Sequence, residues 1–416
     1  MRAYQITGGN PLRGEITISG AKNAVLPIMA ASMLCGGEFT LHHCPNISDV
    51  ENTIRILHCL GCKVKNEGQT LYIDTYSADR NVISPNLMKR MRAAVIFLGA
   101  LLTRFGEARI SHPGGCKLGE RPIDLHLMGL RHMGYCCEYQ SDELLCYAEK
   151  LHGCTIALPF PSVGATENIM LAALRCPDEV VICNAAKEPE ISDLVVFLRK
   201  CGAQISGENT SVLRIYGGKL LHGAVHTILP DRMEAATYLC AAAATRGSIC
   251  LKNVRPEHFV AVTEVLRRAG CDMSVGKGEM TLACSDLHAV SPIRTAPYDG
   301  FPTDAQAPMM AAMATAQGVS VFEENIFSER YRHVPGLQQM GAKIYAAGRC
   351  AVVEGVKTLH GAVLEATDLR GGAAMVLAAL GAEGESTITN IAHIARGYAG
   401  IVDKLSACGA RIRDTE

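Results

Sequence analysis

Cys116 lies in a glycine-rich stretch, residues 111–119, that combines a nucleophile with a nearby cation. Three glycines in this stretch can act as hinges, which is typical of a mobile loop. Lys117 follows directly, and a neighbouring cation favours the thiolate form of a cysteine. The stretch therefore predicts a reactive thiol. The alternative is a structural cysteine, which is the more common role among 18 cysteines.

Basic residues recur near predicted helix starts and glycine-rich turns. Arginine suits bidentate contacts with carboxylates and phosphates, and the unpaired N–H groups at helix starts also attract anions. Each residue taken alone is more often a surface side chain, but the repeated placement predicts an anionic ligand. These residues are Lys22, Arg92, Arg330, Arg370 and Arg396.

Acidic residues open three other predicted helices. Asp304 follows Phe301-Pro302-Thr303, where it can be a base for a substrate hydroxyl or merely a partner of the helix dipole. Asp231 has the same layout. The motif alone therefore does not choose between the two roles.

Two further segments are candidates for contacts with a nucleotide. The helix after Pro161 opens with small residues only, which lets backbone approach a pyrophosphate, although serine and glycine are also ordinary capping residues. Residues 121–125 contain a proline that restricts the backbone, so that their amide groups could read a flat base edge. The alternative for this segment is an ordinary turn with Asp124 as a helix cap.

The candidate residues lie within six copies of one repeated pattern of strands and helices. Each copy has a strand, an alanine-rich helix, a strand, a second helix that closes at a glycine, and further strands, and the copies recur about every 65 to 75 residues. Since the alanine-rich helices are apolar on nearly every side, we expect them to be buried with sheets outside. Their first turns read SGAKNAV, KRMRAAV, VGATENI, PDRMEAA, PTDAQAP and TDLRGGA.

The repeat predicts an α/β chain of two domains with three copies each. The last copy lacks a strand, and the chain start looks like the missing piece. We therefore expect one domain over 22–229 and another over 1–21 with 230–416. Ligands commonly bind in a cleft between such domains.

Composition excludes several classes of function. The chain has 416 residues, a net charge of −1, 48% hydrophobic residues and no tryptophan, which argues against nucleic acid and anionic membranes as partners. The longest apolar run is about half the length that crosses a bilayer. The start of the chain lacks the apolar core of a signal peptide, and we expect a cytoplasmic protein with reduced thiols. Cys59 and Cys62 form a CxxC pair, but no second pair completes a zinc set, so we predict no metal and no cofactor.

Seven segments carry a resemblance that covers essentially the whole chain. They read SGAKNAVLP, HPGGCKLGERPIDLH, PSVGATENI, EPEISDL, RTAPYDGFPTD, ATDLRGGAA and HIARGY. Together they resemble the UDP-N-acetylglucosamine 1-carboxyvinyltransferase family of enolpyruvyl transferases, and the second segment is the most diagnostic. The resemblance implies a two-domain inside-out α/β barrel (α+β) with six βαβαββ repeats, three per domain.

The resemblance also implies the chemistry. Enolpyruvyl would pass from phosphoenolpyruvate to the 3-hydroxyl of UDP-N-acetylglucosamine by addition and elimination, releasing phosphate in the first committed step of peptidoglycan synthesis. Cys116 would protonate the methylene carbon, Asp304 would take the hydroxyl proton, and Lys22 and Arg396 would act on phosphoenolpyruvate. Residues implied to bind the substrates are Lys22, Asn23, Arg92, Arg121, Pro122, Ile123, Asp124, Leu125, Ser162, Val163, Gly164, Asp304, Ile326, Arg330, Asp368, Arg370 and Arg396.

Two other functions stay open. A shikimate-3-phosphate enolpyruvyl transferase would share the fold but lacks the cysteine loop. A non-catalytic paralogue that binds the UDP-sugar is suggested by Ala395, which stands where the family pattern has an aspartate. Lys117 and Phe160 also depart from that pattern. The resemblance further implies sensitivity to the epoxide fosfomycin through the loop thiol. It does not predict an oligomeric state.

Overall fold

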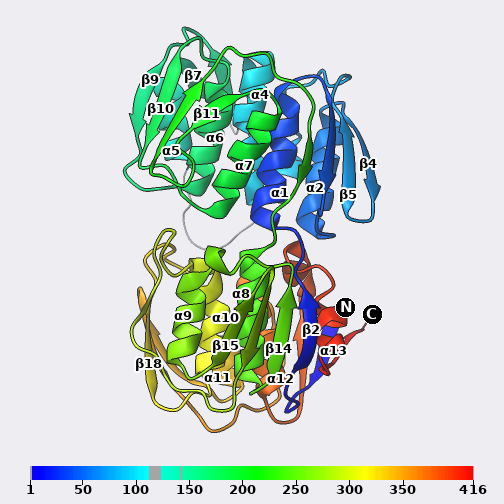
Figure 1. Ribbon diagram of the computed structural model, residues 1–416, viewed down its shortest axis with the longest axis vertical. Helices are drawn as coiled ribbons and strands as arrows, with labels where there is room; N and C mark the ends of the chain where they lie inside the picture. The colour runs from blue at the N-terminus through cyan, green and yellow to red at the C-terminus, as the bar shows by residue number, and fades with distance from the viewer. Residues whose placement is uncertain (1, 112–122, 141–142, 416) are drawn as a thin grey trace. The chain divides into compact units, whose positions relative to one another are not determined.

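The computed structural model describes residues 2–111, 123–140 and 143–415. The described chain divides into two compact units (Figure 1). One unit, here the central unit, comprises the described residues between 20 and 229. The other, here the terminal unit, combines residues 2–19 with residues 230–415.

In the central unit, strands alternate with helices in three successive copies. Its α-helices are α1 (Lys22–Ala31), α2 (Ser48–Cys59), α3 (Pro85–Met88), α4 (Phe97–Phe105), α5 (Asp124–His132), α6 (Val163–Ala173) and α7 (Pro189–Lys200), with 3-10 helices η1 (Ser32–Leu34) and η2 (Arg92–Ile96). Its strands are β3 (Glu38–His42), β4 (Lys63–Glu67), β5 (Thr70–Asp74), β6 (Glu107–Ser111), β7 (Tyr135–Gln140), β8 (Glu143–Ala148), β9 (Cys154–Ala157), β10 (Glu179–Cys183), β11 (Gln204–Ser206), β12 (Val212–Tyr216) and β13 (Val225–Thr227).

The terminal unit repeats the same order. Its α-helices are α8 (Arg232–Ala244), α9 (Val260–Arg268), α10 (Thr303–Met313), α11 (Val334–Gln339), α12 (Leu369–Gly381) and α13 (Ile401–Ala407), with 3-10 helices η3 (Pro256–His258) and η4 (Ile391–Arg396). Its strands are β1 (Ala3–Thr7), β2 (Arg13–Thr17), β14 (Ser248–Lys252), β15 (Asp272–Gly276), β16 (Glu279–Ala283), β17 (Ile293–Arg294), β18 (Val319–Glu323), β19 (Lys343–Ala347), β20 (Cys350–Glu354), β21 (Val363–Glu365), β22 (Glu385–Thr389) and β23 (Arg411–Thr415).

The six copies correspond to six small sheets, three of which also contain a strand from elsewhere in the chain, β1, β2 or β13. Five sheets have four strands, and in each of them the strand after the first helix pairs with one parallel and one antiparallel neighbour. The sheet of the second copy, in the order β6-β8-β7, has three strands. There, a single parallel bridge between Val82 and Arg109 stands in place of the leading strand.

The chain start completes sheets of the terminal unit. β1 lies between β22 and β23 and is antiparallel to both, while β2 pairs in parallel with β14. In turn β13, which leads into α8, pairs in parallel with β3 of the first copy. The pairing of β1 confirms that the chain start supplies a strand that the last copy lacks, and β2 joins the sheet of the fourth copy in the same unit.

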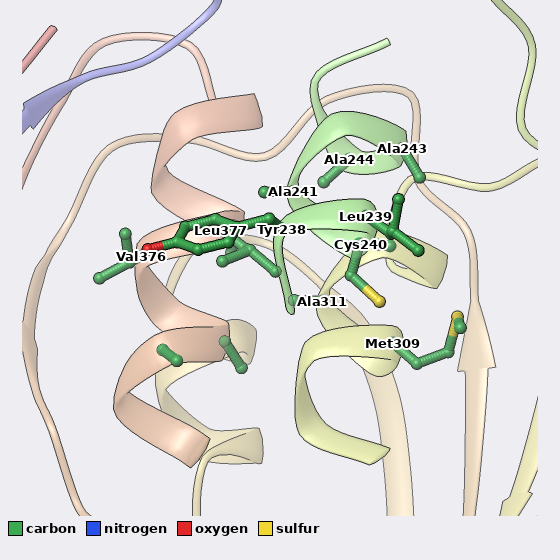
Figure 2. Close-up of a cluster of buried hydrophobic side chains, with 14 of the residues drawn as sticks. Tyr238, Leu239, Cys240, Ala241, Ala243, Ala244, Met309, Ala311, Val376 and Leu377 are labelled. Atoms are coloured by element: carbon green, nitrogen blue, oxygen red, sulfur yellow. The ribbon is translucent and has the colours of Figure 1, made fainter. Parts of the chain in front are cut away.

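The alanine-rich helices form the cores, as predicted. Every residue of α8 is buried, and α8 packs against α10 and α12 (Figure 2). Alanine side chains let the helices approach closely. Larger residues such as Tyr238, Met309 and Leu377 fill the remaining space between them. Since these helices use all their faces for packing, their first turns are what remains for ligand contacts.

The second helix of every copy ends at a glycine, as predicted. The left-handed backbone at this position carries no Cβ penalty for glycine and closes the helix. The Cys59 and Cys62 pair lies at one such end, that of α2, where Cys62 is buried. The six glycines and their φ angles are Gly61 (95°), Gly134 (89°), Gly202 (96°), Gly270 (96°), Gly341 (95°) and Gly409 (88°).

The structure corrects three local expectations. The first helix of the second copy begins as the 3-10 helix η2 and becomes α-helical only at Phe97. Pro27 lies inside α1, although a proline one turn after Gly20 and Lys22 fits a helix start better than a helix middle. Asp124 is the first residue of α5 and Ile123 is its N-cap, so Asp124 is not the cap. Within the described residues, no helix is both long and apolar enough to cross a membrane.

Candidate functional site

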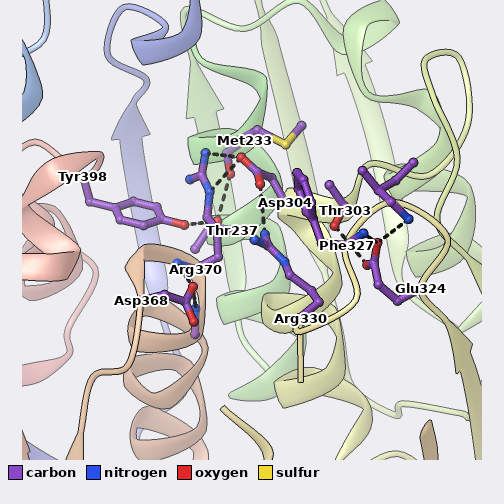
Figure 3. A network of polar contacts seen from close by, with 12 residues as sticks. Met233, Thr237, Thr303, Asp304, Glu324, Phe327, Arg330, Asp368, Arg370 and Tyr398 are labelled. Atoms are coloured by element: carbon purple, nitrogen blue, oxygen red, sulfur yellow. Dashed lines mark hydrogen bonds and ion pairs between the residues drawn. The ribbon is translucent and has the colours of Figure 1, made fainter. Parts of the chain in front are cut away.

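Asp304 is the centre of a network of ion pairs in the terminal unit (Figure 3). It lies in the first turn of α10. Its Oδ1 accepts a hydrogen bond from Arg330 Nη2 at 2.9 Å, and its Oδ2 accepts from Arg370 Nε at 3.2 Å and Nη2 at 3.1 Å. Opposite charges at this distance favour the ionised carboxylate, which is the form that a general base needs.

The two arginines of this network are almost fully buried. Arg330 and Arg370 are 2% and 3% exposed, whereas the Asp304 side chain is 29% exposed. Arg370 also lies with its guanidinium carbon 5.2 Å from the ring centroid of Tyr398, whose hydroxyl group is 2.9 Å from Thr237 Oγ1. The buried arginines thus hold their charge in place, and the carboxylate between them is the part that a ligand can reach.

The structure shows that three aspartates at helix starts have different contacts, which the sequence alone did not distinguish. Asp231 caps α8, since its Oδ1 accepts from the backbone N–H groups of Met233 and Glu234. Asp368 caps α12 in the same way and so fixes the helix that carries Arg370. Asp304 is not a cap, because its carboxylate turns to two guanidinium groups instead.

Glu324 connects the first turn of α10 to the segment that contains Ile326. It is fully buried. Its Oε1 accepts from the N–H groups of Ile326 at 2.8 Å and Phe327 at 3.0 Å, and its Oε2 accepts from Thr303 Oγ1 at 2.9 Å. Glu324 was not predicted from the sequence, where its only signal is an acidic residue directly after the strand Val319–Glu323.

We expect Glu324→Ala to lower the free energy of unfolding by about 3 kcal/mol, because it leaves two N–H groups and one hydroxyl group without their acceptor. Denaturant unfolding measures the change. Glu323→Ala is the matched control, since Glu323 makes an exposed pair with Arg294 and such pairs contribute about 0–1 kcal/mol. Equal losses in the two variants would contradict the positioning role of Glu324.

His333 is a second residue that was not predicted from the sequence. It is fully buried, at the start of α11. Burial lowers its pKa to about 4, although the nearby Asp368 opposes the shift. The imidazole is therefore neutral at physiological pH and adds no positive charge beside Arg330.

In the central unit, Lys22 begins α1 and forms an ion pair. Its Nζ lies 2.7 Å from Asp49 Oδ2, and the two side chains are 11% and 1% exposed. Asp49 lies in the first turn of α2, and it was not predicted from the sequence. The alternative of a solvated surface lysine is thus wrong, because this side chain is mostly buried against a carboxylate.

Other predicted residues of the central unit lie at helix starts. Asn23 is exposed in the first turn of α1, and Arg92 is half-buried at the start of η2. Ile123 is buried, whereas Asp124 is exposed and Leu125 is half-buried at the start of α5.

Residues 162–164 form the start of α6. Ser162 is its N-cap and accepts a hydrogen bond from Ala165 N at 3.4 Å. Val163 and Gly164 follow in the first turn, and both are half-buried. The first N–H groups of a helix have no partner within it, so this turn is suited to an anion.

Three predicted residues, Cys116, Arg121 and Pro122, lie outside the described residues. Arg396 is half-buried at the end of η4, next to Ala395, which is exposed. Within the described part of the chain, no group of three or more His, Cys, Asp or Glu side chains could hold a metal ion. Every described cysteine has a free thiol.

Comparisons with known proteins match the whole chain. The family model described as EPSP synthase (3-phosphoshikimate 1-carboxyvinyltransferase) matches residues 6–405. UDP-N-acetylglucosamine 1-carboxyvinyltransferase 2 of Caldanaerobacter subterraneus subsp. tengcongensis is 44% identical over 413 residues, 99% of either chain. The UDP-N-acetylglucosamine 1-carboxyvinyltransferase of Finegoldia magna is 44% identical over 100% of this chain and 99% of its own. The crystal structure of the enolpyruvyl transferase NikO from Streptomyces tendae superposes with a TM-score of 0.90 at 26% identity, covering 100% of this chain and 99% of that one.

Proposed function

Since the chain belongs to the UDP-N-acetylglucosamine 1-carboxyvinyltransferase family, we propose that it transfers the enolpyruvyl group of phosphoenolpyruvate to the 3-hydroxyl of UDP-N-acetylglucosamine. The observation that carries this proposal is the full-length identity of 44% with relatives of that name. The reaction releases phosphate and is the first committed step of peptidoglycan synthesis.

The reaction proceeds by addition and elimination. The Cys116 thiol protonates the methylene carbon of phosphoenolpyruvate, which makes the adjacent carbon electrophilic. Asp304 takes the proton from the sugar 3-hydroxyl, and the oxygen attacks that carbon to give a tetrahedral phosphate ketal. The thiolate left on Cys116 then takes a proton back from the new methyl group, phosphate departs, and the carbon–carbon double bond forms again. The arrangement of Asp304 between two buried guanidinium groups supports its role, because these groups favour the ionised carboxylate.

Charged groups stabilise the developing charge in this scheme. Lys22, Arg121 and Arg396 hold the phosphate and carboxylate of phosphoenolpyruvate, with Arg370 nearby. The remaining predicted residues bind the nucleotide sugar or support the site, and those at the starts of α1, η2, α5 and α6 lie where backbone N–H groups suit an anion. They are Asn23, Arg92, Pro122, Ile123, Asp124, Leu125, Ser162, Val163, Gly164, Ile326, Arg330 and Asp368.

The domain organisation and the cellular setting belong to the same proposal. We take the central and terminal units as the two domains of three repeats each, and the proposed roles draw on residues of both. The partners are the two small-molecule substrates, without nucleic acid or membrane. The free thiols of the described cysteines support a cytoplasmic location, since disulfides are rare there.

Release of phosphate tests the function. We expect release only when phosphoenolpyruvate and UDP-N-acetylglucosamine are both present. Release with shikimate 3-phosphate in place of the UDP-sugar would instead favour the shikimate enzyme. Calorimetric binding of the UDP-sugar without turnover would favour a non-catalytic paralogue, the alternative that Ala395 suggests.

A further inference from the structure

Asn168 makes an unusual bridge inside the central unit. Its Oδ1 accepts from Gly99 N–H at 2.6 Å, and its Nδ2 donates to Val95 C=O at 2.9 Å. In an uninterrupted α-helix, the Gly99 N–H group would donate directly to the Val95 carbonyl, four residues earlier. The bridge therefore lies where η2 passes into α4. A Cβ at residue 99 would collide with the backbone oxygen of Asn168 and lie 2.8 Å from its Oδ1, so only glycine leaves room for this contact.

This bridge fixes which way the Asn168 amide points. Its oxygen must face the Gly99 N–H group and its nitrogen must face the Val95 carbonyl. The reverse orientation would place the amide NH₂ against an N–H group and the amide oxygen against a carbonyl oxygen. The same Nδ2 also lies 2.8 Å from Nδ1 of His126, a buried residue of α5. Because Asn168 Nδ2 can only donate, His126 Nδ1 is the acceptor. In the neutral ring the proton is then on Nε2.

The Nε2 edge of His126 faces the start of α6. A Cβ built on Gly164 would meet His126 Cε1 at 3.3 Å and Nε2 at 3.5 Å. His126 is 7% exposed. Among the described residues, the only hydrogen bond to its ring is the one from Asn168. The Nε2 side of a buried histidine ring thus lies beside the same helix turn whose backbone N–H groups suit an anion.

The ring stays neutral at physiological pH. Burial lowers the pKa of His126 to about 4, and Arg92 adds to the effect, while Asp124 opposes it. A neutral imidazole with a fixed tautomer is a directional donor rather than a mobile charge. It can therefore select the position of one oxygen atom on a bound group.

We propose that His126 binds a phosphate oxygen of the nucleotide sugar through its Nε2–H group, and that Asn168 is the positioning residue that holds the proton on that nitrogen. This inference rests on the proposed function, and it adds a binding residue that the sequence analysis did not assign. Together with the first turn of α6, His126 supplies a neutral donor set for the diphosphate.

Two variants of His126 separate ligand binding from a merely structural role. Asparagine places its amide near the position of Nδ1 and can still accept from Asn168, but it has no donor at the Nε2 position. Glutamine reaches the Nε2 position with a donor and lacks the acceptor. We expect His126→Asn to raise the Kd for UDP-N-acetylglucosamine and for UDP about tenfold or more, and His126→Gln to raise it less than about threefold.

The KM for phosphoenolpyruvate should stay unchanged in both variants, and thermal unfolding checks that both fold. If His126→Asn binds the nucleotides as well as the wild type, or if His126→Gln is the weaker of the two, the inference is wrong and the role of the ring is structural. If the wild type itself does not bind UDP-N-acetylglucosamine, the proposed function fails first.

A spectroscopic measurement tests the tautomer directly. In a long-range ¹H–¹⁵N spectrum at neutral pH, with the ring assigned through His126→Asn, we expect Nδ1 without a proton and Nε2 with one. Addition of UDP-N-acetylglucosamine should shift the Nε2 signal. A proton on Nδ1, or an Nε2 signal that UDP-N-acetylglucosamine leaves in place, would contradict the proposal.

Discussion

Asp304→Asn is expected to lower kcat by about 10²- to 10⁴-fold, which is the usual contribution of a general base. The amide keeps nearly the same shape and can still accept one hydrogen bond from a buried arginine, but it cannot take the hydroxyl proton. Steady-state kinetics with both substrates measure the loss. The Kd for UDP-N-acetylglucosamine, measured by calorimetry, should change far less than kcat.

The control for this variant is Asp403→Asn. Asp403 is also in the first turn of a helix of the terminal unit, α13, but its side chain is exposed. Its kcat should equal that of the wild type. If Asp304→Asn kept more than about a tenth of the wild-type kcat while the fold was intact, Asp304 would not be the base.

Cys116→Ala is expected to lower turnover at neutral pH by about 10²- to 10⁴-fold, because alanine cannot protonate the methylene carbon of phosphoenolpyruvate. Phosphate release under saturating substrates measures the effect. Binding of UDP-N-acetylglucosamine should persist, since the proposed contacts of the nucleotide sugar do not involve the thiol.

Cys350→Ala is the matched control, because Cys350 is the exposed cysteine of β20 and has no proposed role in the reaction. Its turnover should stay at the wild-type level. A Cys116→Ala enzyme with unchanged turnover at neutral pH would overturn the assignment of the acid, although transfer by another acid would remain compatible with the family.

Much of the fold could be predicted from the sequence alone. Helix periodicity and a closing glycine are local signals, since a left-handed residue such as Gly61 or Gly270 stops a helix wherever the chain is placed. Repetition of these signals revealed six copies, and the all-apolar faces of the alanine-rich helices showed that they are buried. Residue types near the helix starts gave the first candidates for the site, and the family resemblance then assigned their roles.

The tertiary structure alone decided what each candidate touches. Asp231 and Asp304 have the same local sequence layout, yet one caps its helix and the other pairs with Arg330 and Arg370, which come from segments 26 and 66 residues away. In the same way Lys22 meets Asp49, and His126 meets Asn168, 42 residues along the chain. Local patterns set backbone conformation, because that depends on neighbours in sequence. Charge pairing and the direction of a proton depend on neighbours in space, which only the packed chain brings together.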